Sequence, residues 1–349
     1  MLVKKMIRIG IVGATGYTGE ELLRILSKHD SVEVSVVTSS TRKGEHLTDI
    51  FPSLDKFDLR FVSHDSDSLY SCDLIFFATP NATAMHYVPT LIEQGCRIID
   101  LSADFRIQSP ETWQQWYKEK HLCPELLKSA VYGLPEINRD LIIDANLVAN
   151  PGCYPTAITL GLLPAIKNEL IETKGIIANA ISGVSGAGRK AVLSKELSNF
   201  TESFKAYGVF SHRHLPEITQ ILNDVNPVSD IDLTFTPHLV SMHRGIHATI
   251  YANLSVSEDE IRNHYTNFYS QEKFVDVLPE NSYPETKNVE MTNMCNIGLH
   301  FNNEEPQKMI ILSVIDNLIK GAAGQAIQNM NLMFGFNEEN GLVPIKLDN

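Results

Sequence analysis

The chain has 349 residues, of which 43% are hydrophobic and 20% are charged, a composition typical of a globular enzyme. This length exceeds the usual size of one domain, so we expect two domains. The formal net charge of −13 argues against a nucleic-acid-binding protein, which would carry a basic surface. No apolar run is long enough to cross a membrane, and a strand predicted from Ile7 leaves no room for a signal peptide.

The five cysteines are widely spaced and include no Cys-x-x-Cys pair: Cys72, Cys96, Cys123, Cys153 and Cys295. An odd number of isolated cysteines predicts neither a disulfide framework nor a zinc site. Cys72 and Cys96 flank apolar segments, and we interpret them as packing residues. The expected compartment is a reducing cytoplasm.

The first predicted strand, residues 7–12, leads into a turn with the sequence Gly13-Ala14-Thr15-Gly16-Tyr17-Thr18-Gly19 and then into a helix. This order of elements is the context in which a glycine turn binds a dinucleotide. The Gly-x-x-Gly-x-x-Gly spacing still provides a tight turn, close approach to a pyrophosphate and helix N–H groups directed at the anion. A loop that needs glycine only for flexibility is the alternative. The predicted cofactor contacts are Gly13, Thr15, Gly16, Tyr17 and Thr18.

The second predicted strand, residues 33–37, ends in a polar run from Thr38 to Lys43. An NAD site normally has an acidic residue near this point to bind the ribose 2′-hydroxyl. This chain has hydroxyl groups and Arg42 instead, which suit a 2′-phosphate. We therefore expect Ser39 and Arg42 to favour NADP over NAD, although Arg42 and Lys43 in a solvated loop are the alternative.

Further strands predicted over residues 74–78 and 97–101, with a helix near residues 82–94, continue the alternation. This alternation predicts an α/β fold with a parallel, doubly wound sheet, a Rossmann-type dinucleotide-binding domain.

Arg106 follows the last of these strands, at the carboxyl end where such sheets bind ligands. It is a candidate anion-binding residue, and an ion pair with Asp100 or Asp104 is the alternative.

The segment Asn150-Pro151-Gly152-Cys153-Tyr154-Pro155-Thr156 places a cysteine on a tight turn between an apolar run and a helix that we expect to begin near Pro155. A thiol there lies close to backbone N–H groups and to the positive end of a helix dipole, and both favour the nucleophilic thiolate. A small buried core residue is the usual fate of a cysteine and is the alternative. Cys153 is our candidate nucleophile.

Two polar segments follow Cys153. Small residues from Ser182 to Gly188, followed by Arg189 and Lys190, offer backbone N–H groups and cations to an anion, without the spacing of a nucleoside-triphosphate site. Further along, His212 and His214 flank an arginine. Metal binding would need a third ligand, so we interpret these histidines as proton carriers for the cysteine.

The remaining chain alternates as strands over residues 232–254, 295–301 and 309–314, with few helices between them. This pattern predicts an α+β domain with a largely antiparallel sheet on the substrate side. Arg244 adds a cation to the possible site. Small residues from Gly321 to Gly324 precede a final helix and allow close approach of a cofactor or of the first domain.

Together, these motifs resemble the N-acetyl-gamma-glutamyl-phosphate reductase family, the arginine-pathway relative of aspartate-semialdehyde dehydrogenase. The matching segments are residues 13–19, 100–106, 150–157, 182–190, 212–218 and 316–325. They lie in order over nearly the whole chain, from residue 7 to about 334. Ser241 is a minor departure, since proline is expected before the methionine, and it affects loop stiffness rather than chemistry.

The resemblance implies a Rossmann-type domain of residues 1–152 and 316–349, and a catalytic and oligomerisation domain of residues 153–315. It implies a reversible reaction with NADP(H) in which Cys153 attacks a γ-acyl phosphate, phosphate leaves, and reduction of the thioester releases N-acetylglutamate semialdehyde. His214 is the implied general acid/base, with His212 as the alternative.

The resemblance also extends the set of site residues and gives the assembly. The implied substrate-binding residues are Arg106, Ser182, Arg189, His212 and Arg244, with no anion assigned to a particular arginine. Pro80 and Asn317 complete the implied cofactor contacts, and no metal is expected. The family implies a homo-oligomer, either a dimer or a tetramer.

Two other interpretations fit part of this pattern. An aspartate-semialdehyde dehydrogenase or an aminoadipate-type reductase would use the same chemistry, but residues 100–106 and 212–218 favour the acetylglutamyl enzyme. A non-catalytic NADP sensor would keep the fold, but it would leave Cys153 and His214 unexplained.

Overall fold

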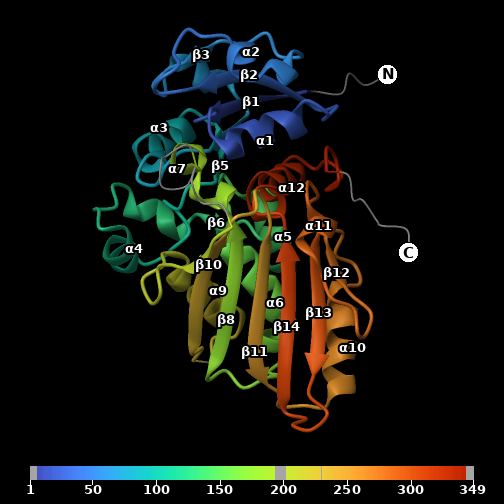
Figure 1. Cartoon of the computed structure of the whole chain (residues 1–349). Coiled ribbons are helices and arrows are strands. Elements are labelled where there is room, and N and C mark those ends of the chain that lie inside the picture. The colour runs from blue at the N-terminus through green and yellow to red at the C-terminus, as the bar shows by residue number, and fades with distance from the viewer. Residues whose placement is uncertain (1–5, 193–201, 229, 343–349) are drawn as a thin grey trace. The chain divides into compact units, whose positions relative to one another are not determined.

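The computed structural model describes residues 6–192, 202–228 and 230–342 (Figure 1). The chain forms two compact units. The first contains the described residues up to Pro151 and those from Ala322 onward, and the second contains those from Gly152 to Gly321. The chain therefore passes from one unit to the other directly before Cys153 and directly after Gly321.

The first unit is built on a parallel sheet in the order β3-β2-β1-β4-β5-β7-β6. Its strands are β1 (Ile7–Val12), β2 (Val32–Thr38), β3 (Phe61–Val62), β4 (Leu74–Phe77), β5 (Arg97–Asp100), β6 (Val131–Tyr132) and β7 (Leu147–Ala149). Strands such as β4 are buried along their whole length, as expected for a sheet covered on both faces. The strand order changes direction at β1, so the predicted doubly wound α/β fold is confirmed.

Helices alternate with these strands. They are α1 (Tyr17–Leu26), α2 (Leu47–Ile50), α3 (Val88–Glu93), α4 (Pro110–Tyr117), α5 (Pro135–Asp144) and α12 (Gly324–Met333). The last helix, α12, packs against α1 and α5. Arg97, at the start of β5, fixes this arrangement, because its guanidinium donates to the carbonyls of Ala145 and Met333 near the ends of α5 and α12.

The sheet of the second unit has the order β12-β13-β14-β11-β8-β10-β9. Its strands are β8 (Ile176–Gly183), β9 (Phe204–Ala206), β10 (Leu233–Val240), β11 (Ile246–Asn253), β12 (Val275–Val277), β13 (Cys295–Phe301) and β14 (Lys308–Ile315). Figure 1 shows β8, β11, β14 and β13 side by side, each antiparallel to its neighbour.

The expectation of a largely antiparallel sheet fits only loosely, because the sheet is mixed. β8 pairs in parallel with β10, and β12 pairs in parallel with β13. A parallel pair needs a crossover connection, and the chain between β8 and β10 contains a helix, α9 (His214–Val225). The sequence pattern predicts the strands but not the order or direction in which they pair.

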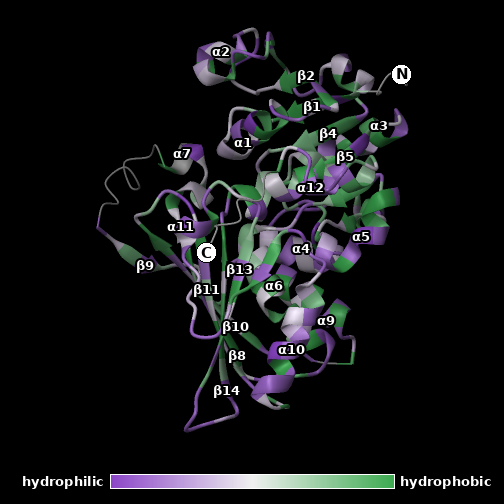
Figure 2. Ribbon diagram, turned by 90° about the vertical axis from the view of Figure 1, so that its right-hand side faces the viewer, coloured by the Kyte–Doolittle hydropathy of each residue, from purple (hydrophilic) through white to green (hydrophobic). Residues whose placement is uncertain are grey.

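Three helices cover one face of this sheet: α6 (Cys153–Lys167), α9 and α10 (Glu258–Tyr269) (Figure 2). The side chains of α6 are buried from Tyr154 to Ile166, so this helix forms the centre of the unit. A Cβ on Gly161 would lie 2.9 Å from Ile250 Cδ1, so glycine here allows α6 to lie close to β11. The short helices α7 (Arg189–Val192) and α11 (Thr286–Val289) lie outside this layer.

A proline inside α6 is accommodated by α10. Pro164 has no N–H, so Leu160 O loses its donor within the helix. The buried hydroxyl of Tyr269 donates to Leu160 O at 2.5 Å, and that of Tyr265 donates to Gly161 O at 2.7 Å. Tyr269 replaces the missing bond, and the two tyrosines together fix α10 against α6.

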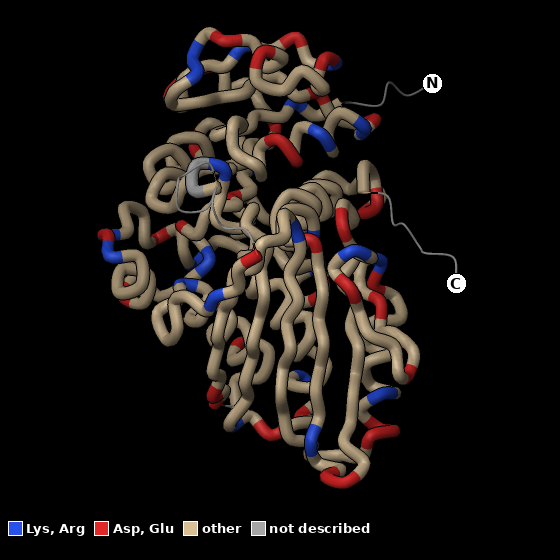
Figure 3. The backbone as a smooth tube through the Cα atoms, in the orientation of Figure 1, with Lys and Arg blue, Asp and Glu red and all other residues tan. Residues whose placement is uncertain are grey.

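The middle parts of the long strands of the second unit contain no charged residues, as the tan colour of these strands in Figure 3 shows. The strands alternate between buried and partly exposed residues, with the buried ones facing the helices. Within the part of the chain that the structure describes, no helix is long and apolar enough to span a membrane.

Candidate active site

Three glycines after β1 differ in what a side chain would meet. Gly13 has a φ of 84°, and a Cβ there would lie 2.7 Å from Ala78 O, so backbone and space both require glycine. At Gly19 a Cβ would lie 2.5 Å from Ala14 O, which explains how α1 packs so closely on the turn. At Gly16 the nearest atom would be 3.9 Å away. The turn therefore has open space beside Gly16, where a dinucleotide pyrophosphate approaches the backbone in this class of fold.

The first turn of α1 presents N–H groups to this space. Gly16 caps the helix with extended backbone, and Tyr17 and Thr18 follow at positions whose N–H groups have no acceptor within a helix. A hydrogen bond fixes the turn to the end of β2, because Gly13 N donates to Thr38 Oγ1 at 3.3 Å. Thr15 lies partly exposed in the same turn. These residues fit the phosphates of a dinucleotide.

The remaining cofactor candidates of the first unit also follow carboxyl ends of its strands. Ser39 is buried after β2, and its hydroxyl accepts from Thr41 N at 3.4 Å. Arg42 is exposed and forms an ion pair with Glu45 at 3.2 Å. Pro80 is exposed after β4. All three follow the carboxyl ends of strands, which is the side of the sheet where doubly wound folds bind ligands.

Arg106 is buried in the loop after β5 and supports the backbone around it. Its Nε donates to Asn150 O at 2.7 Å, and one terminal nitrogen donates to Leu101 O at 2.8 Å. Burial raises the pKa of the nearby Asp100 to about 7, the charge of Asp104 adds to this rise, and Arg106 opposes it. Arg106 thus joins β5 to the segment that leads to Cys153.

Cys153 is the first residue of α6, two positions before the predicted start, and is half-buried. The preceding Gly152 N donates at 2.8 Å to the carboxylate of Glu217, a fully buried residue of α9. On another side, a Cβ on Gly321 would lie 2.8 Å from Cys153 Cβ. The thiol therefore occupies a fixed position at a helix N-terminus, where the dipole favours a thiolate.

The two candidate histidines lie around the ring of Tyr154. Its centroid is 5.5 Å from that of His212 and 5.9 Å from that of His214. Nδ1 of His212 accepts from His214 N at 3.1 Å, so the neutral form of His212 carries its proton on Nε2. Burial lowers the pKa of His212 to about 4, with a smaller effect from the charge of Arg213. His212 is therefore a neutral hydrogen-bond donor near pH 7. His214 is the first residue of α9.

Two phenols complete this cluster. Tyr154 donates to His238 O at 3.1 Å, and its oxygen lies 3.1 Å from the hydroxyl of Tyr207. Burial raises the pKa of Tyr207 to about 12, and the charge of nearby Cys153 contributes to this rise. Both hydroxyls therefore stay protonated beside the thiol, because burial also raises the pKa of Tyr154.

The end of β8, the segment that follows it and the loop before β11 contain candidate anion-binding residues. Ser182 is buried, pairs with Ile246 in the ladder and donates to Gly183 O at 3.0 Å. Arg189 begins the short helix α7. Arg244 has a side chain only 11% exposed, and it lies 3.4 Å from a carboxylate oxygen of Asp316.

Asn317 belongs to the second unit, unlike the other predicted cofactor residues. Its Oδ1 accepts from Gly245 N at 2.8 Å, and its Nδ2 donates to Ser185 Oγ at 3.0 Å. The amide thus joins the loop after β8 to the start of β11.

Sequence reasoning missed the residues that hold the site together: Tyr154, Tyr207, Glu217, Asp316 and Gly321. Glu217 follows His214 by three positions, so both lie on one face of a helix, and this spacing was the available signal. The contacts of Asp316 with Arg244 and Met291 N, and of Gly321 with Cys153, depend on tertiary packing and have no local signal. Among the described residues, no cluster of histidine, cysteine and carboxylate side chains is arranged to hold a metal ion.

Known proteins were compared with this chain. A family model for the semialdehyde dehydrogenase NAD binding domain matches residues 8–145, and one for the semialdehyde dehydrogenase dimerisation domain matches residues 153–317. N-acetyl-gamma-glutamyl-phosphate reductase of Cellvibrio japonicus is 52% identical over 347 residues, which cover 98% of this chain and 99% of the relative. That of Acinetobacter baumannii (strain ACICU) is 51% identical with the same coverage.

The chain belongs to the N-acetyl-gamma-glutamyl-phosphate reductase family. Solved structures agree on the fold. Aspartate semialdehyde dehydrogenase II from Vibrio cholerae has a TM-score of 0.73 and 17% identity, and covers 95% of this chain and 99% of its own. The Candida albicans aspartate semialdehyde dehydrogenase with NADP has a TM-score of 0.70 and 14% identity over the same shares.

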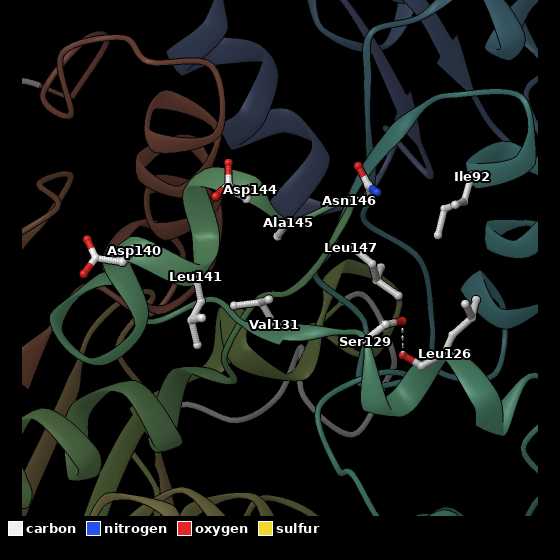
Figure 4. A pocket seen from close by; sticks show the side chains of 10 residues that line it. All are labelled: Ile92, Leu126, Ser129, Val131, Asp140, Leu141, Asp144, Ala145, Asn146 and Leu147. Carbon is white, nitrogen blue, oxygen red and sulfur yellow. Dashed lines mark hydrogen bonds between the residues drawn. The ribbon is translucent and has the colours of Figure 1, made fainter.

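A cavity of about 360 Å³ lies elsewhere in the first unit (Figure 4). Leu141 and Asp144 of α5 line it, together with Asn146 and Leu147 at the amino end of β7. Doubly wound sheets bind their ligands at the opposite, carboxyl ends of the strands, so we do not assign this cavity to the active site.

The glycine turn gives a prediction with a matched control. Gly16→Ala fits without a clash but places a methyl group in the space for the pyrophosphate. We expect the KM for NADPH to rise at least ~10-fold, while the free energy of unfolding changes by less than about 1 kcal/mol. Gly19→Ala should instead destabilise the fold by about 1–3 kcal/mol, because it overpacks the turn.

Steady-state kinetics and urea unfolding measure both effects. An unchanged KM for NADPH in Gly16→Ala would show that the pyrophosphate binds elsewhere.

Proposed function

We propose that this protein reduces N-acetyl-gamma-glutamyl phosphate to N-acetylglutamate 5-semialdehyde and phosphate with NADPH, as a step of arginine biosynthesis. The observation that carries the proposal is a cysteine at the N-terminus of a buried helix, followed by a tyrosine whose ring contacts two histidines. Relatives about 50% identical over nearly the whole chain carry the name of this reductase.

Cys153 is the proposed nucleophile. Its thiolate attacks the acyl carbon of the substrate, a carbon–sulfur bond forms, the bond from carbon to the phosphate oxygen breaks, and phosphate leaves. A thioester accepts hydride more readily than a carboxylate, which is why a covalent stage is useful. N–H groups in the first turn of α6 stabilise charge that develops at the acyl oxygen.

The glycine turn, Ser39, Arg42, Pro80 and Asn317 are the proposed contacts for NADPH. The open space at Gly16 and the N–H groups of α1 fit its pyrophosphate, and Arg42 supports a preference for the 2′-phosphate. When bound, NADPH supplies the hydride that reduces the thioester. The protein contributes position and charge.

His214 is the proposed general acid/base. It takes the proton from the Cys153 Sγ before attack and returns a proton when the aldehyde is released. His212 is the proposed hydrogen-bond donor to the substrate, because its low pKa keeps it neutral and its Nε2–H can donate to a substrate oxygen. Glu217 positions both partners, since it binds Gly152 N from the helix that His214 begins.

Ser182, Arg189, His212 and Arg244 are the proposed substrate-binding residues of the second unit. They lie at the end of β8, at the start of α7, just before α9 and just before β11. Arg106 of the first unit is proposed as a further partner for an anion of the substrate.

We also propose a homo-oligomer, a dimer or a tetramer, that forms on the open face of the second sheet. Ile177 of β8 and Tyr251 of β11 are both 41% exposed on strands of this sheet, and the matched family model describes a dimerisation domain. The cytoplasm is the proposed compartment. None of the five cysteines forms a disulfide, which suits reducing conditions.

The proposal is tested with Cys153→Ser in an assay of N-acetylglutamate semialdehyde oxidation with NADP and phosphate or arsenate. A serine hydroxyl is far less acidic than a thiol, so we expect turnover to fall at least ~1,000-fold while NADP binding persists. Cys96→Ser, in the buried core of the first unit, is the control and should keep full turnover. Wild-type activity in Cys153→Ser would refute the proposal.

The two histidines form a second, matched pair of variants. His214→Asn should lower kcat by about 100- to 1,000-fold and remove one limb of the pH–rate profile. His212→Asn should lower kcat by only about 10-fold and keep the shape of the profile, because a group with a pKa of about 4 does not titrate near neutral pH. Rates measured from roughly pH 5.5 to 9 compare the two. The opposite assignment follows if His212→Asn changes the profile and His214→Asn does not.

A further inference from the structure

Asp316 is a fully buried carboxylate that follows β14. Its Oδ1 accepts from Leu318 N at 2.8 Å and from Ile319 N at 3.2 Å. Its Oδ2 accepts from Met291 N at 2.8 Å and from Arg244 at 3.4 Å. Backbone N–H groups therefore fix both oxygens, and the position of the carboxylate does not depend on Arg244.

The backbone on either side of Arg244 is fixed as well. Gly245 N donates to Asn317 Oδ1, and Gly245 O accepts from Gly183 N at 3.0 Å. A Cβ on Gly183 would lie 2.7 Å from His243 O, so the two loops are in close contact. Arg244 thus starts from a rigid loop and ends at a rigid carboxylate.

The same carboxylate residue is connected to the nucleophile. Gly321 N donates to Asp316 O at 2.9 Å within a π-helical turn (Ile319–Ala323), and Gly321 lies against Cys153. The turn from Asp316 to Gly321 therefore has the anchor of Arg244 at one end and the thiol at the other. A π-helical turn is an uncommon conformation that is frequent at functional sites.

We infer that Arg244 binds the α-carboxylate of the substrate and that Asp316 is the positioning residue that holds Arg244 for this contact. The inference rests on the proposed function, which supplies a substrate whose carboxylate and acyl carbon are joined by a short carbon chain. One end of this chain reaches Arg244 while the other reaches Cys153.

The charge of Asp316 distinguishes between the two anions of the substrate. Asp316 offsets part of the attraction that Arg244 exerts on any anion, while the cost of removing an anion from water rises with the square of its charge, so the pair suits a singly charged carboxylate better than a phosphate dianion. The planar guanidinium also matches a carboxylate in a two-point contact. The phosphate, which leaves from the acyl carbon, fits better at the N–H groups next to Cys153.

The test compares N-acetylglutamate semialdehyde with its α-carboxamide analogue, which has the same shape without the charge. The wild type should prefer the acid by roughly 10- to 100-fold in kcat/KM. Arg244→Gln should lose most of this preference through a higher KM for the acid. Arg262→Gln, which removes a charge from α10 where Arg262 pairs with Glu258, is the control and should keep it.

Asp316→Asn tests the positioning role. It should lower the ratio of kcat/KM for the acid to kcat/KM for the amide. A purely structural role would instead lower kcat/KM equally for both substrates and leave this ratio unchanged. Should this variant fold poorly, Arg244→Lys gives a second measure, because it keeps the charge but loses the planar contact and should give an intermediate ratio.

The outcomes separate the inference from the proposed function. A wild type that oxidises the semialdehyde with an acid-to-amide ratio that Arg244→Gln does not change would overturn the inference alone. A wild type that turns over neither compound would overturn the proposed function and the inference with it.

Discussion

The first turn of α6 is the constraint on which the rest of the second unit depends. Gly152 N is bound by a buried carboxylate, and Cys153 leaves no room for a side chain at Gly321. The helix behind this turn is buried from Tyr154 to Ile166 in the core of the unit. A nucleophile at the end of such a helix has a better-defined position than one on a loop, and precise position is a main source of catalytic rate.

Burial determines the protonation state of several groups around the thiol. His212, Tyr154 and Tyr207 are held in their neutral forms by burial. They can donate hydrogen bonds but do not exchange protons near neutral pH. This agrees with the proposal that His214 carries the proton chemistry and that an anchored cation such as Arg244 binds an anion of the substrate.

Features could be predicted from local sequence where the residues that a site needs also determine the backbone conformation. The turn from Gly13 to Gly19 could be predicted because glycines with this spacing lie between a strand and a helix; Gly13 and Gly19 have no room for a side chain, and Gly16 leaves space for a ligand. The position of Cys153 near a helix start could be predicted because a Pro-Gly turn precedes it, whereas its role as nucleophile stays a prediction. The strand predicted over residues 295–301 has the observed bounds.

Tertiary contacts explain what the sequence left open. Glu217 reaches Gly152 only because α9 docks against α6, and no local pattern encodes that docking. Arg106 was predicted as an anion-binding residue, but its sequence position gave no sign of the carbonyls of Leu101 and Asn150 that it also binds. The parallel pairing of β8 with β10 likewise follows from the path of the chain, not from the strand sequences.

The central claim is that Cys153 accepts the acyl group, and trapping of the acyl-enzyme tests it most directly. The protein would be mixed with N-acetyl-gamma-glutamyl phosphate without NADPH, quenched in acid and analysed by mass spectrometry. The account predicts one N-acetylglutamyl adduct on the peptide that contains Cys153, which hydroxylamine releases as expected of a thioester. An active enzyme that gives no adduct, or an adduct on another residue, would contradict it.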